Sequence, residues 1–241
     1  MTTKFEICSS KDLLHYVQVT LQNDSVRTEA GVARYWRGNI QMTSQMPTMK
    51  GFFKSTMTGN KVFRPIYTGT GTLMLTPRFH EFVSFDLKNE RYVIEKGAYW
   101  ASDMGVEVDI QVNNVAAGMM SGEGFFQTAV QGTGTVIACS PGPVEVVDLK
   151  NDRLVLDGAY AVARSSTLNF TVQKSSRSFT GTLVSGQGLV QVLQGTGRVY
   201  FSPVPNHTIA LQEIIVDSIT GNIAGMILPK KKGLMGMLSK K

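Results

Sequence analysis

The sequence has little of the material from which many catalytic and binding sites are built. Only two cysteines, Cys8 and Cys139, occur in 241 residues. They are too few for a disulfide framework, and neither has the spacing of a zinc site. This usage favours a reducing compartment, and we expect a cytoplasmic protein. Residues 1–11 contain no apolar segment of the kind that a secretory signal needs.

Histidine is also scarce. The chain contains three histidines, His15, His80 and His207, and no two lie within a strand length of each other. A three-fold arrangement of repeats could bring them together as ligands in a metal-dependent enzyme. Isolated histidines at strand edges are far commoner. The metal-dependent enzyme is therefore the third-ranked functional hypothesis, and we expect no metal or other cofactor.

The motifs of common enzyme classes are missing. There is no Gly-x-Ser-x-Gly elbow of a serine hydrolase, and no phosphate-binding loop or dinucleotide fingerprint. No apolar run is long enough to span a bilayer as a helix. These absences favour a protein that binds or organises partners over an enzyme, and we predict no catalytic residues.

Charge is sparse and unevenly distributed. Charged residues make up 17% of the chain, which carries a net charge of +6. Residues 229–241 hold five lysines and no acid, so removing them leaves the body of the chain at +1. A nearly neutral body argues against a broad nucleic-acid-binding face.

The basic tail, residues 229–241, is the best local indication of function. Its lysines flank four leucine and methionine residues, a composition typical of segments that lie on an anionic membrane or dock in a groove. The alternative is a solubilising, disordered end. The predicted membrane or partner contacts are Lys230, Lys231, Lys232, Leu234, Met235, Met237, Leu238, Lys240 and Lys241.

Repetition is what the sequence has in abundance. Gly-Thr-Gly occurs at residues 69–71, 132–134 and 195–197, so successive copies are separated by equal intervals. A Leu-x-Asn-acid segment begins at Leu21, Leu87 and Leu149, at a nearly constant distance before its Gly-Thr-Gly. Two signals that keep nearly equal spacing through three copies indicate one supersecondary unit used three times. We expect repeats at about residues 15–78, 79–141 and 142–204.

Each repeat has the pattern of β-structure. Alternating apolar residues surround the Asn-Asp or Asn-Glu pair, which predicts a hairpin at each copy. Asparagine suits such a place because it tolerates the left-handed conformation. The repeat glycines favour a bulge or a close approach of strands, and an anion site lined by their backbone amides is the minor alternative. These glycines are Gly69, Gly71, Gly132, Gly134, Gly195 and Gly197.

Further positions align between the copies. Without gaps, residues 61–64 match residues 124–127, which makes Arg64 equivalent to Gln127, and we take residues 188–191 as the third copy. We interpret Tyr35-Trp36, Tyr99-Trp100 and Tyr160-Ala161 as a second equivalent set that packs in the core; the less favoured alternative is a stacking platform for bases. Residues 205–228 form a partial closing unit, in which Ile209, Leu211 and residues 214–216 are predicted strands. A single β domain would thus cover residues 1–228.

With the repeats placed, the chain resembles a known family. Residues 121–127 leading to 131–134, their counterpart 185–188 leading to 194–197, and residues 28–31 resemble the altered-inheritance-of-mitochondria (mitochondrial biogenesis) family, over most of residues 13–205. The resemblance, to a bacterial-type member, implies a fold similar to the tryptophan-RNA-binding attenuator protein. That fold would be all-β: a three-repeat β-sandwich of the double-stranded β-helix type with pseudo-three-fold symmetry. Mitochondrial members are associated with inner-membrane organisation, whereas this sequence shows no transit peptide.

The sequence therefore predicts a non-enzymatic binding or scaffold protein that is peripheral to an anionic membrane through its basic tail. The alternative is nucleic-acid binding by analogy to the attenuator protein. Exposed strand edges in repeated sandwiches often self-associate, so we also expect a homo-oligomer. The sequence identifies no small-molecule ligand.

Overall fold

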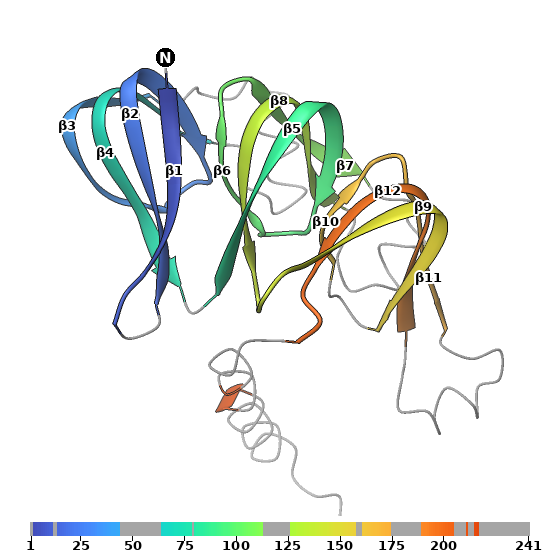
Figure 1. Ribbon diagram of the computed structural model, residues 1–241. Helices are drawn as coiled ribbons and strands as arrows, with labels where there is room; N and C mark the ends of the chain where they lie inside the picture. Colours follow the sequence, from blue (N-terminus) through green and yellow to red (C-terminus); the bar gives the residue numbers. More distant parts are fainter. Residues whose placement is uncertain are drawn as a thin grey trace, which may run out of the picture.

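A computed structural model describes residues 2–11, 14–43, 64–78, 80–112, 126–157, 161–174, 189–204, 211 and 215–216. Its regular elements are twelve β-strands (Figure 1), all paired antiparallel within one large sheet. The protein is therefore all-β, as the sequence predicts. The first unit contains β1 (Thr2–Ser9), β2 (His15–Thr28), β3 (Ala33–Thr43) and β4 (Ile66–Arg78). The second contains β5 (Glu81–Ile94), β6 (Tyr99–Asp103), β7 (Val106–Val112) and β8 (Phe126–Ser140), and the third β9 (Glu145–Asp157), β10 (Ala161–Ser165), β11 (Asn169–Lys174) and β12 (Leu189–Phe201).

The three units repeat one strand arrangement. A long pair forms the centre of each unit: β2 with β4, β5 with β8, and β9 with β12. The second long strand of each pair also pairs on its other side, with β3, β7 and β11 respectively. The three units lie side by side in chain order in Figure 1. The equal spacing in the sequence is thus matched by equal strand pairings in space.

The Asn-Asp and Asn-Glu pairs do not form the predicted hairpins. Each lies inside an uninterrupted long strand, at the point where the ladder shifts register opposite the Gly-Thr-Gly of its partner. The bulged residues Asn23, Asn89 and Asn151 have φ between 51° and 58°. The expectation of a left-handed asparagine is therefore confirmed, but the prediction of a turn is wrong. A bulge and a tight turn both require one residue in the left-handed conformation. The local sequence therefore did not distinguish a bulge from a turn.

The threonine of each Gly-Thr-Gly completes the bulge. The backbone N–H of the bulged asparagine donates to the threonine hydroxyl at 3.0–3.1 Å in all three units. A bulged residue is excluded from the ladder, so its N–H needs such a partner. The pairs are Asn23 with Thr70, Asn89 with Thr133, and Asn151 with Thr196.

The glycines lie on either side of this threonine, where neighbouring strands come very close. A Cβ added to Gly69 would lie 1.9 Å from the Asn39 carbonyl oxygen, and one added to Gly132 would lie 2.3 Å from that of Gly105. Gly195 is different, because the nearest atoms would be 3.8 Å away. All three have φ between 125° and 141°, a backbone conformation that side chains rarely adopt.

Each unit has its own hydrophobic core, and the first two cores also contain side chains from the following unit. The first core includes Phe82, Trp100 and Ile137 of the second unit among its buried members. The second includes Val162 and Tyr200 of the third unit. Among the described residues, the third core consists of side chains of its own unit alone. Burial of apolar surface therefore stabilises the junctions as well as the units.

Short backbone pairings join consecutive units. Residues Val26–Thr28 of β2 pair with Ala101–Asp103 of β6, and residues 92–94 of β5 pair with residues 163–165 of β10. At both junctions, the residue after the first strand adds one more bond. The Glu29 N–H donates to the Trp100 carbonyl at 2.8 Å, and the Glu95 N–H to that of Val162 at 2.9 Å. The two junctions are thus copies of each other.

Two parts of the chain differ from expectation. The predicted strands in the closing unit are wrong at Leu211, Ile215 and Val216, whose backbone is helical. Leu211 and Ile215 are four residues apart, which is the spacing of one helix face, so the apolar pattern there suited a helix as well as a strand. Strand β1, which pairs with residues 15–22 of β2, was not predicted from the sequence. Ile209 and the basic tail lie outside the described residues.

Candidate functional site at the junction of the second and third units

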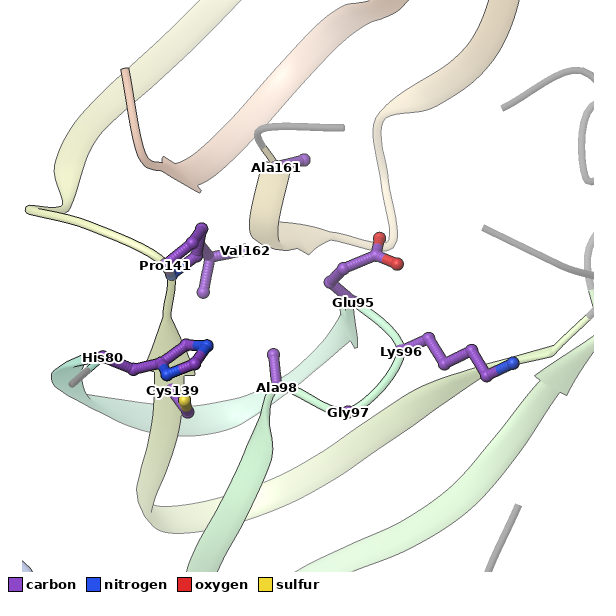
Figure 2. Close-up of a pocket in the computed structure, with 9 residues that line it drawn as sticks. All are labelled: His80, Glu95, Lys96, Gly97, Ala98, Cys139, Pro141, Ala161 and Val162. Carbon is purple, nitrogen blue, oxygen red and sulfur yellow. The ribbon is translucent and has the colours of Figure 1, made fainter. Parts of the chain in front are cut away.

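A pocket of about 300 Å³ lies at this junction. Its volume is at the lower end of the range for small-molecule sites. The turn between β5 and β6, the end of β8 and the start of β10 form its walls (Figure 2). Its lining residues are His80, Glu95, Lys96, Gly97, Ala98, Cys139, Pro141, Ala161 and Val162.

Backbone bonds fix the shape of the pocket. The Ala98 N–H donates to the Glu95 carbonyl at 3.0 Å, and the Cys139 N–H donates to the Ala98 carbonyl at 2.7 Å. Gly97 closes this turn with φ of 79°, which glycine adopts without a steric penalty. The Glu95 N–H also donates to the Val162 carbonyl across the junction. These backbone hydrogen bonds hold the walls of the pocket in a fixed arrangement.

The polar side chains of the pocket have distinct positions. Figure 2 shows the His80 ring beside Cys139 and Pro141, whereas the Lys96 side chain extends away from the pocket. Cys139 is 5% exposed. The hollow thus presents an imidazole, a carboxylate and a thiol among apolar walls. Such a set can bind a small polar molecule by hydrogen bonds and charge.

A buried polar chain supports the Glu95 carboxylate. The Gln127 amide nitrogen donates to Glu95 Oε2 at 3.1 Å, and an Arg164 guanidinium nitrogen donates to Gln127 Oε1 at 2.8 Å. Arg164 also lies over the Phe170 ring, 4.1 Å from its centroid. Buried polar groups of this kind are stable only when they are hydrogen-bonded. These hydrogen bonds fix the position of Glu95 through Gln127 of the second unit and Arg164 of the third unit.

The first junction has the same plan with different chemistry. Arg64, which the sequence aligns with Gln127, lies 3.4 Å from a carboxylate oxygen of Glu29. Arg64 also lies over the Tyr99 ring, 5.0 Å from its centroid. Burial raises the pKa of Tyr99 to about 12, although its hydrogen bond with Ser102 and the charge of Arg64 act in the opposite direction. The aligned position therefore contacts the equivalent glutamate at both junctions.

Glu29 and Glu95 were not predicted from the sequence as site residues. A signal was available, because both occur as Glu-x-Gly just after a long strand, at residues 29–31 and 95–97. That signal is weak because the third copy reads Asp157-Gly158 and shifts by one position. The shared role became visible only through the backbone bonds at the junctions.

The histidines occupy separate environments. His15 Nδ1 lies 2.6 Å from Glu81 Oε2, and His80 lines the pocket. His207 lies outside the described residues. Within the described part of the chain, no group of three or more His, Cys, Asp or Glu side chains is placed to hold a metal ion.

The aromatic pairs are not equivalent in the way that the sequence suggested. Tyr35 lies opposite Met74, and its true counterparts are Ala101 and Ala163, which lie opposite Ile137 and Tyr200. Tyr35 and Trp36 are exposed, and Trp36 packs against Tyr67 with ring centroids 5.4 Å apart. Tyr99 and Trp100 are buried, as the core interpretation expected. An identical Tyr-Trp dipeptide thus occupies two different registers.

A model of the mitochondrial biogenesis AIM24 family matches residues 5–204 of the chain. The chain belongs to this family. It is also 25% identical over 151 residues to an uncharacterised protein of Streptococcus pyogenes serotype M6. That match covers 61% of this chain and 60% of the relative, so the chain spans less than two thirds of the length of this relative.

The AIM24 fold is supported by a solved structure. A crystal structure of a Streptococcus pyogenes protein superposes with a TM-score of 0.66 and 21% sequence identity. The match covers 92% of this chain and 99% of the other. At this identity the likeness concerns the fold alone. No helix among the described residues is long and apolar enough to cross a membrane.

Proposed function

We propose that this AIM24 protein is a non-enzymatic scaffold and binding protein. The observation that carries the proposal is that the repeated polar features serve the architecture. In all three units the threonine hydroxyl of Gly-Thr-Gly accepts the N–H of a bulged asparagine. The flanking glycines allow close backbone approach in the first two units. The features that define the repeat thus build a rigid array of units.

The finer fold assignment belongs to the same proposal. Three equivalent long pairs, three equivalent bulges and two equivalent junctions support a pseudo-three-fold set of attenuator-protein-like β-sandwich units of the double-stranded β-helix type. We assign the first three units to about residues 15–78, 79–141 and 142–204. In this arrangement the second junction supplies the pocket as a binding site for a small polar molecule.

The scaffold would contact an anionic membrane surface from the cytoplasmic side through its basic tail. Support comes from the sequence, because residues 229–241 carry five lysines around four apolar side chains. Basic residues near an anionic bilayer contribute about 1 kcal/mol each. The nearly neutral body makes the tail the dominant electrostatic feature of the chain.

Flotation with liposomes tests the membrane contact. Full-length protein and a variant that ends at Leu228 are mixed with phosphatidylcholine vesicles, either with added phosphatidylserine or without it. We expect full-length protein to float with the anionic vesicles and the shortened protein to stay at the bottom. Equal flotation of the two proteins would contradict the proposal.

Nucleic-acid binding is the second candidate, favoured by one observation on β3. Tyr35 and Trp36 are exposed there and flanked by the exposed Arg34 and Arg37. Exposed aromatic and arginine side chains are the elements that bind single strands by stacking and charge. A salt-dependent gel shift with single-stranded RNA that survives tail deletion and is lost in Trp36→Ala would establish this function. A shift that disappears with the tail would rule it out for β3.

A further inference from the structure

The two junctions within the chain pair the same strands of consecutive units in the same way. In each, the part of the long strand that follows the Asn bulge pairs on its outer edge with the second strand of the next unit, β6 or β10. Most of the paired residues are buried, and Val93 is only 6% exposed, whereas Arg27, its counterpart at the first junction, is half-buried. The third unit has the same strand, β9. Among the described residues, β9 pairs with β12 and with no strand on its outer edge.

The register identifies the equivalent edge of β9. Glu90 of β5 lies opposite Gly132, and Asp152 of β9 lies opposite Gly195. Counting onward from these matched positions, residues 92–94 correspond to residues 154–156, so Val155 is the counterpart of Val93. Val155 is 44% exposed. Within the described part of the chain, the third unit therefore leaves open the edge that its two predecessors use.

Among the strands that the structure describes, the first unit leaves the complementary edge open. The residues that enter a preceding unit are Ala101–Asp103 and Ala163–Ser165. Their counterparts by register are residues 35–37 of β3, because Tyr35, Ala101 and Ala163 each lie opposite the residue three positions after a Gly-Thr-Gly. Within the described strands, β3 pairs with β4 and with nothing on its other side. Trp36 is 43% exposed there.

We propose that the β9 edge of one copy pairs with the β3 edge of a second copy, in the antiparallel register that the two in-chain junctions already use. Residues 154–156 then lie opposite residues 35–37, with Val155 opposite Trp36. The proposal names the surfaces for the homo-oligomer expected of a scaffold, and in that respect it rests on the proposed function. The contact joins two different edges, so it is head-to-tail and can propagate or close into a ring.

Backbone geometry supports the same pairing. At the second junction the Glu95 N–H donates to the Val162 carbonyl, and the Ser166 N–H donates to the Arg91 carbonyl at 2.9 Å. Residues 91, 93 and 95 therefore direct their backbone groups outward, since these groups alternate along a strand. Val155 is the counterpart of Val93, so its N–H and carbonyl face the open edge. The second copy supplies partners for both.

The cores give an independent reason. The first and second cores are completed by side chains of the next unit, whereas the described third core has none from outside its own unit. Docking of the β3 edge would bring Tyr35 and Trp36 to the end of the third unit and bury apolar surface on both sides. Exposed, unpaired strand edges with apolar side chains are the surfaces that associate.

A proline substitution at Val155 tests the backbone pairing in the full-length protein. Val155→Pro removes an outward-facing N–H, and proline is tolerated at such edge positions. The matched control Val155→Thr keeps both the N–H and the β-branched shape. By sedimentation velocity, we expect oligomers of the 26.3 kDa chain for wild type and Val155→Thr, and at least a ten-fold weaker association for Val155→Pro. Identical sedimentation of the two variants, or a wild type that stays monomeric at micromolar concentration, would overturn the proposal.

A cross-linking experiment covers the case in which Val155→Pro fails to fold. Directly opposite residues in a hydrogen-bonded antiparallel pair have Cα atoms about 5.5 Å apart, a distance that a disulfide can bridge. Oxidised Trp36→Cys/Val155→Cys protein should form a ladder of linked chains on a non-reducing gel. Each single variant controls for Cys8 and Cys139 and should remain unlinked. A double variant that behaves like the single variants would contradict the pairing.

These tests separate the two proposals. Flotation depends on the tail, and the edge variants leave the tail unchanged. If the edge variants abolish oligomers while the chain still floats, self-association and membrane contact are independent properties. If the double cysteine variant cross-links but the full-length protein does not float with anionic vesicles, the head-to-tail contact is supported and the membrane contact is contradicted.

Discussion

Asn89 and Thr133 face each other across the centre of the second unit, where the Asn89 N–H donates to the Thr133 hydroxyl at 3.1 Å. Asn89 has φ of 58° and is the bulged residue of β5. The same relationship joins Asn23 to Thr70 and Asn151 to Thr196. One bulge with one hydroxyl partner is thus the feature on which each unit is built.

The left-handed conformation of Asn89 predicts a specific pattern of tolerance. Asn89→Val should lower the free energy of unfolding by about 1–2 kcal/mol, because a β-branched residue is strained at positive φ. Asn89→Gly should be nearly neutral, since glycine adopts this conformation freely. Urea denaturation of the two variants measures the difference. Equal destabilisation would show that the asparagine side chain, and not its φ, is what the site needs.

The repeat glycines are predicted to differ in sensitivity although their motifs are identical. Alanine at Gly69 would place Cβ 1.9 Å from the Asn39 carbonyl oxygen, whereas at Gly195 the nearest atom is 3.8 Å away. Gly195→Ala should therefore cost only the backbone strain, about 1–2 kcal/mol. Gly69→Ala should cost a further 1–3 kcal/mol, roughly, from the clash. Thermal unfolding of both variants checks this order, and the reverse order would contradict the close approach of β3 and β4.

Two arginines provide a matched test of buried and exposed polar contacts. Arg164 is 5% exposed and donates to Gln127 in the chain that supports Glu95. Arg198 pairs with Asp148 at 2.7 Å, where both side chains are about half exposed. Arg164→Met should destabilise the protein by about 2 kcal/mol, and Arg198→Met by less than about 1 kcal/mol. Chemical denaturation curves distinguish these values. Similar losses of stability in the two variants would argue against the buried hydrogen bonds that connect Arg164 to Glu95 through Gln127.

The buried Tyr99 predicts a loss of stability at high pH. Burial raises its pKa to about 12 from an ordinary value of 10.0. Between pH 10 and 12 the unfolded chain therefore loses this proton while the folded chain keeps it, so folding stability decreases as pH rises through that window. Below pH 10 the contribution is fully present. Tyr99→Phe should remove this part of the pH dependence, which urea denaturation at pH 9, 10 and 11 measures. An unchanged slope in Tyr99→Phe would show that Tyr99 does not contribute.

The sequence predicted the repeated architecture because each repeat depends on local rules. The equal offset between copies, the bulged asparagines and the glycines all reflect what single backbone positions require. The predicted hairpins failed because a left-handed asparagine between apolar runs has the same local signature in a bulge and in a turn. Strand β1 was missed because it lies outside the repeat, so no second copy pointed to it.

The junctions were much harder to predict, because their register depends on contacts between units. Tyr35-Trp36 and Tyr99-Trp100 share a dipeptide, yet the ladders place Tyr35 opposite Met74 and Tyr99 opposite Ala138. Only the pairing shows that one aromatic pair is buried and the other is exposed at an open edge. The pocket likewise combines segments of two units. Its polar support from Arg164 has no local sequence signal.

Native mass spectrometry of gently purified full-length protein tests most directly the central claim, which is the proposed pairing of the β9 and β3 edges between copies. The account predicts species at multiples of the 26.3 kDa chain mass, which are lost in Val155→Pro and kept in Val155→Thr. A single species at the monomer mass for the wild-type protein at micromolar concentration would contradict it.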